Sequence, residues 1–352
     1  MKKLETSVVH IGKELELHNE DFKIAGEIIR SGGLVAFPTE TVYGIGANAL
    51  DEEALLKIYK AKGRPSDNPL IMHISNVDCL PKYVNEISDK ALSLIEAFWP
   101  GPLTLVFNKS DLVPSIVTGG LNTVAIRMPK HPIAKNIIEQ AGLPVAAPSA
   151  NLSGKPSPTR GQHVIDDLSG RVDMIIDGGK AHLGLESTVL DVSGDIPCIL
   201  RPGSITHSMI EEVVGTVHYD AHLSDESSVP KAPGMKYKHY APKGTLKIVS
   251  GEEEVKVINY INSEGQKLIE QGRKVGVITP EHAKGEFNLS VVESIGHIDN
   301  PTEIGSNLFK ILRKMDDANV DDIFSFEFKG EEVTVAIMNR LIKAAGHTII
   351  EV

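Results

Sequence analysis

A short apolar run followed by a dense polar segment constrains this chain more than any other feature. Residues 34–37 are apolar and follow two glycines, which is typical of a buried strand entered from a turn. Pro38 has no backbone N–H to give to a sheet, so we expect the strand to end there. Residues 38–46 then carry three hydroxyls, one carboxylate and two glycines. Because open α/β sheets bind ligands in loops at strand ends, we predict a binding loop here, with an ordinary polar turn as the alternative.

A glycine pattern inside this segment fits the relaxed dinucleotide-binding fingerprint G-x-G-x-x-A, at residues 44–49. The fingerprint requires its first glycine directly after a strand, in the turn that opens a helix. Here residues 38–43 separate Phe37 from Gly44, and Asp51 is a typical N-cap of the helix that follows. The helix therefore starts too late, and we do not expect a nicotinamide cofactor.

Composition predicts a globular protein of two domains. The chain has 352 residues, of which 41% are hydrophobic and 24% are charged, and its net charge is −11. This acidic balance argues against a nonspecific nucleic-acid coat, although a local basic patch remains open. Cys79 and Cys198 have no metal-site or redox spacing, so we expect buried thiols in a reducing compartment. With no apolar signal core and no membrane-length run, we predict a cytoplasmic protein that does not bind membranes.

The periodicity of the apolar residues divides the chain into three segments. Residues 1–214 alternate strands and helices, residues 215–244 lose apolar periodicity, and residues 245–352 return to strand, helix and strand. We therefore predict an α/β domain, a linker, and a smaller α/β domain that shows no catalytic constellation. The second half of the linker is rich in aromatic, His and Lys residues, which favours a functional loop over a spacer.

Polar side chains recur at the ends of other apolar strands. They are His73 in residues 70–74, Arg127 in residues 123–129, Ser149 after residues 143–147, Ser187 in residues 185–192, and Arg201 after residues 198–200. A buried arginine needs an anionic partner, which for Arg127 is either a ligand or a distant Asp or Glu. A single histidine such as His73 on an apolar strand is more often a hydrogen-bonded core residue. We expect Gly63 and Pro65 to end the helix that starts at Asp51. Lys60, Lys62 and Arg64 lie around that end, and, taken alone, they are more simply explained by the helix dipole than by a ligand.

These residues together indicate one kind of chemistry. The first domain offers hydroxyls, cations and amides, with no histidine-activated nucleophile and no metal-ligand cluster in its sequence pattern. Such a set suits an anion-rich substrate. Phosphoryl or nucleotidyl transfer needs mainly positioning and charge neutralisation, so it is the reaction class that we favour.

The ordered motifs of the chain closely resemble the long form of the L-threonylcarbamoyl-adenylate synthases, whose catalytic part is the YrdC-like domain. The motifs lie at residues 38–44, 60–65, 68–70, 125–127, 148–151, 186–188, 201–203, 233–237 and 239–240. The resemblance implies a YrdC-like twisted mixed sheet with helices in residues 1–214, a linker or lid in 215–244, and a Rossmann-like α/β domain in 245–352. It implies a nucleotidyltransferase that joins L-threonine, bicarbonate or carbon dioxide, and ATP into threonylcarbamoyl-AMP and pyrophosphate.

The resemblance also assigns roles to individual residues. The implied catalytic residues are Lys62 and Arg64. The implied threonine contacts are Thr41, His73, Arg127 and Ser187. The implied ATP contacts are Arg64, Asn68, Thr123, Ser149, Ser157, Arg201, Tyr237 and His239. Lys60 would add positive potential near the phosphates, and Tyr237 and His239 would close over the nucleotide. No protein metal ligand is implied; Mg²⁺ would arrive with ATP and be held mainly by its phosphates.

Two other functions remain open at this stage. One is a non-catalytic RNA-binding YrdC-like module, which a basic concave face without threonine binding would favour. The other is a carbamoyl transferase like the YrdC-like part of hydrogenase-maturation proteins, which also carry acylphosphatase and zinc-binding regions; this chain shows no cysteine clusters. In the favoured function the product passes to downstream threonylcarbamoyl transferase proteins that modify tRNA, so tRNA is an indirect partner.

Overall fold

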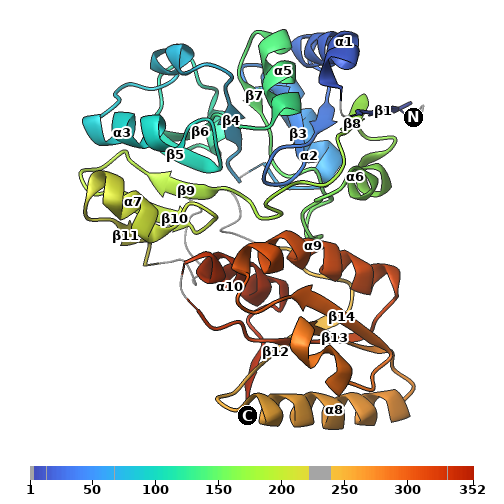
Figure 1. The fold of residues 1–352 in the computed structure, drawn as a ribbon. Coiled ribbons are helices and arrows are strands. Elements are labelled where there is room, and N and C mark those ends of the chain that lie inside the picture. The colour runs from blue at the N-terminus through green and yellow to red at the C-terminus, as the bar shows by residue number, and fades with distance from the viewer. Residues whose placement is uncertain (1–3, 13, 67, 222–238, 331) are drawn as a thin grey trace. The chain divides into compact units, whose positions relative to one another are not determined.

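The computed structural model describes residues 4–12, 14–66, 68–221, 239–330 and 332–352. The chain divides into two compact units (Figure 1). The first comprises Met1–Ser153 and Ser157–Tyr237, and the second comprises Gly154–Pro156 and Lys238–Val352. Both units are α/β, as the sequence predicts.

The first unit is built on a mixed sheet with the strand order β1-β8-β2-β3-β7-β4-β6-β5-β9-β10-β11. Its strands are β1 Ser7–His10, β2 Val35–Phe37, β3 Gly44–Asn48, β4 Ile71–His73, β5 Leu103–Asn108, β6 Thr123–Arg127, β7 Val145–Ala146, β8 Met174–Asp177, β9 Thr188–Asp191, β10 Cys198–Arg201 and β11 His218–Tyr219. The sheet contains both parallel pairs, such as β4 with β6, and antiparallel pairs, such as β5 with β6. The prediction of a mixed sheet is confirmed.

Helices cover this sheet and form two apolar clusters with it. They are α1 Asn19–Arg30, α2 Glu52–Lys62, α3 Asp89–Phe98, α4 Ser115–Thr118, α5 Pro132–Ala141, α6 Gly161–Leu168 and α7 His207–Val214, with 3-10 turns at Leu15–His18 and Val77–Lys82. Helices α1 and α5 lie side by side and bury Phe22, Ile29 and Ile137 against β2. The larger cluster packs α2 and α3 against the sheet. The side chains of Cys79 and Cys198 are only half-buried, so the expectation of buried thiols is wrong.

Helix α2 begins and ends where the sequence predicts. The Asp51 carboxylate accepts hydrogen bonds from the backbone N–H groups of Glu53 at 2.9 Å and Ala54 at 3.2 Å, which caps the first turn. Gly63 ends the helix in the left-handed conformation, with φ of 63°. These two caps fix the ends of α2. They therefore fix the positions of Lys62, in its last turn, and of Arg64, just after its C-cap.

The polar segment after β2 is shorter than the sequence suggests. Residues 44–48 form strand β3, which runs antiparallel to β2, so the loop ends at Tyr43. Gly46 is required there because a Cβ would lie 2.6 Å from the Phe37 ring and 2.8 Å from Val145. Both glycines of the dinucleotide-like pattern thus lie in a strand, which agrees with our rejection of that motif.

The second unit has a five-stranded parallel sheet with the order β14-β13-β15-β12-β16. Its strands are β12 Thr245–Ser250, β13 Val275–Pro280, β14 Val291–Gly296, β15 Asp322–Phe326 and β16 Ile349–Glu351, and its helices are α8 Glu254–Glu270, α9 Pro301–Asp317 and α10 Val333–Ala344, with a 3-10 turn at Glu281–Glu286. The strand and helix alternation predicted after residue 244 is confirmed. Strand β16 was not predicted, because three residues are too few to show the alternation of apolar and polar side chains that marks a strand.

Candidate active site

The candidate site lies on one face of the large sheet, over its central strands. β4 and β6 are parallel neighbours, in which Ile71 pairs with Ala125 and His73 pairs with Arg127. Because side chains alternate along a strand, Ile71 and His73 share a face, as do Thr123, Ala125 and Arg127. The intervening residues of both strands belong to the main core on the opposite face.

A small apolar floor separates two polar ends on this face. Its residues form a buried cluster distinct from the main core, namely Ile71, Val106, Ala125, Val189 and Leu200. Arg127 stands at one end of β6 and Thr123 at the other. Four residues along a strand span about 13 Å, so the face is long enough for an extended substrate.

Arg127 ties the loop after β2 to this face. Its Nη1 donates to Thr41 Oγ1 at 2.9 Å, its Nη2 donates to Glu40 Oε1 at 2.6 Å, and its Nε donates to the carbonyl of Gly101 at 3.1 Å. The distant carboxylate that we considered as a partner therefore exists, and it is Glu40. A guanidinium has five N–H groups, so two remain for a ligand carboxylate.

Glu40 is a buried carboxylate held by several donors. Besides Arg127, the backbone N–H groups of Lys130 and His131 donate to it, each at 3.2 Å. Burial alone would raise the pKa of Glu40, but the charge and hydrogen bond of Arg127 outweigh it and the pKa is lowered. Glu40 is therefore ionised at neutral pH, and it fixes the plane of the guanidinium.

His73 is buried and neutral. Burial, reinforced by the charge of Arg127, lowers its pKa to about 3. The carbonyl oxygen of Ile71, 3.2 Å from Nδ1, and that of Val145 both lie beside the ring, so its single N–H can serve either of them, and the other ring nitrogen keeps a lone pair.

Ser187 is held by two neighbours at the same end of the face. Its Oγ lies 2.7 Å from Thr104 Oγ1, and Arg201 Nη2 donates to it at 3.2 Å. Arg201 also donates to the Ser187 carbonyl from Nε at 3.1 Å and from Nη2 at 3.0 Å. The structure thus brings Arg201, a predicted ATP contact, directly against Ser187, a predicted threonine contact.

Lys62 joins two motifs that are far apart in the sequence. Its buried Nζ donates to the carbonyl of Ser149, to the carbonyl of Asn151 at 2.7 Å and to Asn151 Oδ1 at 3.4 Å. The ammonium therefore holds the loop of residues 149–151 against the end of α2. Lys60 is exposed and lines a separate pocket.

Asn68 carries a buried amide without a hydrogen-bond partner among the described residues, at either Nδ2 or Oδ1. Its own carbonyl accepts from the Tyr59 hydroxyl at 3.0 Å, which fixes its backbone at the start of β4. Because native proteins rarely leave such groups unsatisfied, the amide is poised to bind a ligand. Asn68 lies three residues before Ile71, the first residue of β4. Because β4 and β6 are parallel, Asn68 precedes β4 at the same end of the sheet at which β6 starts with Thr123.

A second loop residue completes the polar set. The Ser157 hydroxyl donates to Glu186 Oε1 at 2.6 Å, and both side chains are buried. Ser157 therefore stands beside the segment that carries Ser187. Arg64, half-buried, follows the C-cap of α2, and its backbone N–H donates to the Tyr59 carbonyl at 3.0 Å.

Comparisons with known proteins identify the family of this chain. A family model described as "Telomere recombination" matches residues 27–203, and one described as "Threonylcarbamoyl-AMP synthase, C-terminal domain" matches residues 205–346. A Bacillus subtilis protein named threonylcarbamoyl-AMP synthase is 48% identical over 97% of this chain and 98% of its own length. The chain belongs to the threonylcarbamoyl-AMP synthase family. The resemblance inferred from the sequence motifs is confirmed.

A solved structure of the same family agrees over the whole chain. The crystal structure of the Pyrococcus abyssi protein Sua5, complexed with L-threonine, has 46% sequence identity and a TM-score of 0.91, and the match covers 99% of both chains. A Pyrococcus abyssi protein named threonylcarbamoyl-AMP synthase is 47% identical over 99% of this chain and 100% of its own length. Both domains predicted from the sequence thus occur together in relatives of this synthase family.

Sequence reasoning missed three residues that this member of the synthase family places in the site. Glu40 was named only as part of the motif at residues 38–44, although a carboxylate among hydroxyls is itself typical of a polar site. Thr104 is a polar residue within the apolar strand β5. Its neighbour Leu105 pairs with Ile126 of β6, so Thr104 lies opposite Arg127. Asn151 was named only as part of a motif, and its contact with Lys62 depends on a fold that no local pattern reveals.

Some predicted contacts are not tested by the geometry. Tyr237 lies outside the described residues, and His239 lies in the second unit, where its ring is 5.5 Å from that of Tyr240. The roles of both in binding the nucleotide stay predictions. Among the described residues, no three His, Cys, Asp or Glu side chains come together to hold a metal ion. Within the same residues, no helix is long and apolar enough to cross a membrane.

Proposed function

We propose that this chain is a threonylcarbamoyl-AMP synthase that uses L-threonine, bicarbonate or carbon dioxide, and ATP, and releases pyrophosphate. The observation that carries the proposal is the sheet face between Arg127 and Thr123. One end offers a guanidinium, a neutral imidazole and a hydroxyl, and the other offers a hydroxyl and, before β4, a buried amide that has no hydrogen-bond partner in the described part of the chain. Such a face suits an amino acid at one end and a nucleotide along the rest.

The threonine would bind at the end that carries Arg127. Its carboxylate would pair with the two remaining N–H groups of Arg127, and the Ser187 hydroxyl would donate a further hydrogen bond. The hydroxyl of threonine would hydrogen-bond to the ring of His73, which is neutral. A hydroxyl and a neutral imidazole can each donate and accept, so they match as partners.

The nucleotide would lie along the rest of the face, with Asn68, Thr123 and Ser149 toward its other end, Ser157 and Arg201 near Ser187, and Arg64 as a further contact. The amine of threonine would take up carbon dioxide as a carbamate, and a carbamate oxygen would attack the α-phosphorus of ATP with pyrophosphate as the leaving group. This reaction needs no nucleophile from the protein, and positioning with neutralisation of charge supplies most of the catalysis. Lys62 already bonds to loop carbonyls, so we assign it to holding Ser149 in place.

Magnesium would enter this reaction as part of the ATP substrate. Two carboxylates of the proposed site already have protein partners, Glu40 with Arg127 and Glu186 with Ser157. Hydroxyls and amides are the other oxygen donors there, and Mg²⁺ often takes most of its ligands from phosphates and water. The product would then serve the threonylcarbamoyl transferase proteins that modify tRNA, in the cytoplasm.

Pyrophosphate release from ATP tests this proposal. The full chain should release pyrophosphate only when L-threonine and bicarbonate are both present with Mg²⁺. D-threonine is the matched substrate control and should give the rate without amino acid. Equal turnover with and without L-threonine would contradict the proposal, and binding of RNA without any pyrophosphate release would favour the non-catalytic RNA-binding module instead.

Arg127→Lys separates the role of geometry from that of charge. Lysine keeps the positive charge but cannot present two parallel N–H groups to a carboxylate. Loss of one charge-assisted hydrogen bond costs about 1.5–3 kcal/mol, which corresponds to roughly ten- to a hundredfold weaker threonine binding. Calorimetry with L-threonine measures this directly, and unchanged affinity would remove Arg127 from the site.

A further inference from the structure

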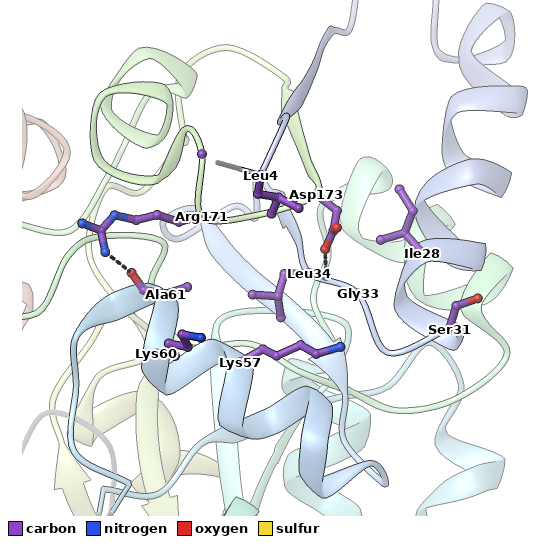
Figure 2. Close-up of a pocket in the computed structure, with 11 residues that line it drawn as sticks. Leu4, Ile28, Ser31, Gly33, Leu34, Lys57, Lys60, Ala61, Arg171 and Asp173 are labelled. Carbon is purple, nitrogen blue, oxygen red and sulfur yellow. Dashed lines mark hydrogen bonds between the residues drawn. The ribbon is translucent and has the colours of Figure 1, made fainter. Parts of the chain in front are cut away.

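A second hollow of the first unit lies at the opposite end of β2 from the candidate site. It has a volume of about 770 Å³. Figure 2 shows Leu34, just before β2, between Lys57 and Lys60 of α2 and the segment before β8 that carries Arg171 and Asp173. The polar loop of the candidate site follows β2, whereas this pocket precedes it. None of the residues that line the pocket is an assigned threonine or ATP contact.

Two cations of this pocket are held in place by backbone carbonyls, and the Asp51 carboxylate lies near Lys57. Lys57 Nζ donates to the carbonyl of Gly32 at 2.7 Å, and Arg171 Nη1 donates to the carbonyl of Ala61 at 3.3 Å. A carbonyl is a neutral partner, so each cation keeps its full charge. The described ion pairs include neither of these side chains nor Lys60.

Asp173 is the one carboxylate among the described lining residues. Its Oδ2 accepts the backbone N–H of Leu34 at 2.7 Å, so it is committed to joining the start of β2 to the segment before β8. Three cations and one carboxylate leave the lining with a net positive charge, on a chain whose net charge is −11. A local positive site on an acidic protein attracts small anions.

The rest of the lining is apolar. Ile28, Leu34 and Ala61 supply apolar side chains to the lining (Figure 2). Pockets that bind small molecules typically measure about 300–1,000 Å³ and combine apolar walls with a few placed polar groups. The size and the lining of this pocket both fit that description.

We propose that this pocket binds a small anion with an apolar body, such as an aromatic or aliphatic carboxylate, phosphate or sulfonate. The apolar part would lie against Ile28 and Leu34, and the acidic group would pair with Lys57 or Lys60, which lie one turn apart on α2, while Arg171 adds positive charge at the other side of the pocket. The proposal does not depend on the synthase reaction, because none of the lining residues is an assigned threonine or ATP contact.

The test uses 8-anilinonaphthalene-1-sulfonate, an apolar aromatic anion whose fluorescence rises in apolar surroundings. It is titrated into the full folded chain with ATP and L-threonine at saturating concentration, so that the candidate active site is filled. We expect saturable binding of one probe per chain that weakens as salt is raised. Lys57→Gln/Lys60→Gln should weaken this binding about tenfold or more, and Lys60→Gln alone should weaken it to a smaller degree.

Lys90→Gln is the matched control. Lys90 is also an exposed helical lysine whose Nζ donates to a carbonyl, that of Asp195 at 2.9 Å, but its hollow is lined by Glu86, Asp89 and Asp195. This variant should bind the probe as the wild type does. The uncharged analogue N-phenyl-1-naphthylamine should bind the wild type and the double variant within about twofold of each other.

Three outcomes would overturn the proposal. They are equal affinity of the sulfonate probe for the wild type and the double variant, an equal loss in Lys90→Gln, and absence of saturable binding. Thermal unfolding of every variant guards against binding of the probe to partly unfolded protein. Because Lys60→Gln removes an exposed side chain, it keeps the test valid even if loss of the Lys57 bond to Gly32 impairs folding.

Discussion

Arg127 and Glu40 form a buried ion pair, with Nη2 of the arginine 2.6 Å from Oε1 of the glutamate. The two residues are far apart in the sequence, and each comes from a polar segment at a strand end. Breaking such a pair by removing one charge leaves the other buried and uncompensated. The pair therefore couples the stability of the first unit to the geometry of the proposed threonine site.

Glu40→Gln should lower the free energy of unfolding by about 3 kcal/mol at pH 7. The pKa of Glu40 is lowered in the folded state, so its contribution is present above the ordinary pKa of a carboxyl and is lost as pH falls through the folded value. The difference between wild type and variant should therefore shrink in acid. Denaturant unfolding, followed by the fluorescence of Trp99, the only tryptophan, measures it in the first unit.

L-threonine provides a second measurement on the same variant. If its carboxylate pairs with Arg127, it replaces the lost counter-charge, so L-threonine should raise the melting temperature of Glu40→Gln more than that of the wild type. Glu139→Gln, which alters an exposed pair with Lys135, is the control and should behave as the wild type. An equal shift in all three proteins would argue against contact between threonine and Arg127.

Asn68→Leu should separate folding from ATP binding. The Asn68 amide is buried without a partner among the described residues, and such a group costs about 1–3 kcal/mol. An apolar side chain of similar size should therefore keep or raise the stability of the ligand-free protein. The same change removes the proposed ATP contact, so KM for ATP should rise about tenfold or more. A variant that is destabilised while its KM for ATP is unchanged would mark Asn68 as purely structural.

The local features of this chain follow from the sequence, whereas the pairs that join distant segments do not. Asp51 and Gly63 predicted the ends of α2 because caps act within one turn. Strand β3 was missed because its glycines resemble turn residues, and only the close approach of Phe37 explains Gly46. Which carboxylate meets Arg127 depends on the order of the strands, which no local pattern specifies.

The same limit applies to the site. Thr41, His73, Arg127 and Ser187 were placed by resemblance to a family, and the structure brings Thr41 and Arg127 into contact and pairs His73 with Arg127 on adjacent strands. Thr104 was missed because a single threonine within an apolar strand has many ordinary roles. Its importance depends on a 2.7 Å contact across the sheet with Ser187.

Thr104→Val tests whether Thr104 positions the Ser187 hydroxyl. Arg201 donates to Ser187 Oγ, so if Thr104 also donates to it, the Ser187 proton is left for the ligand. Valine keeps the shape of threonine but removes that donor. KM for L-threonine should rise about tenfold, while KM for ATP stays within about twofold.

Thr104→Ser restores the hydroxyl and is the matched control. It should recover most of the affinity for L-threonine, which a role in packing alone would not predict, because serine lacks the methyl group of threonine. Equal defects in Thr104→Val and Thr104→Ser would assign Thr104 to packing and leave the orientation of Ser187 to Arg201.

His73→Gln should change how the stability of the first unit depends on pH. The pKa of His73 is lowered to about 3 by burial and by the charge of Arg127, against about 6.5 in the unfolded chain. Between these values the unfolded chain binds a proton that the folded chain does not, so wild-type stability falls as pH drops below about 6.5. From pH 7.5 to pH 5.0 this linkage removes about 2 kcal/mol. Glutamine does not titrate, so the variant should lose about that much less over the same interval, whatever its stability at pH 7.5. Unfolding followed by Trp99 fluorescence at both pH values gives the two slopes, and equal slopes would mean that His73 takes up its proton in the folded state.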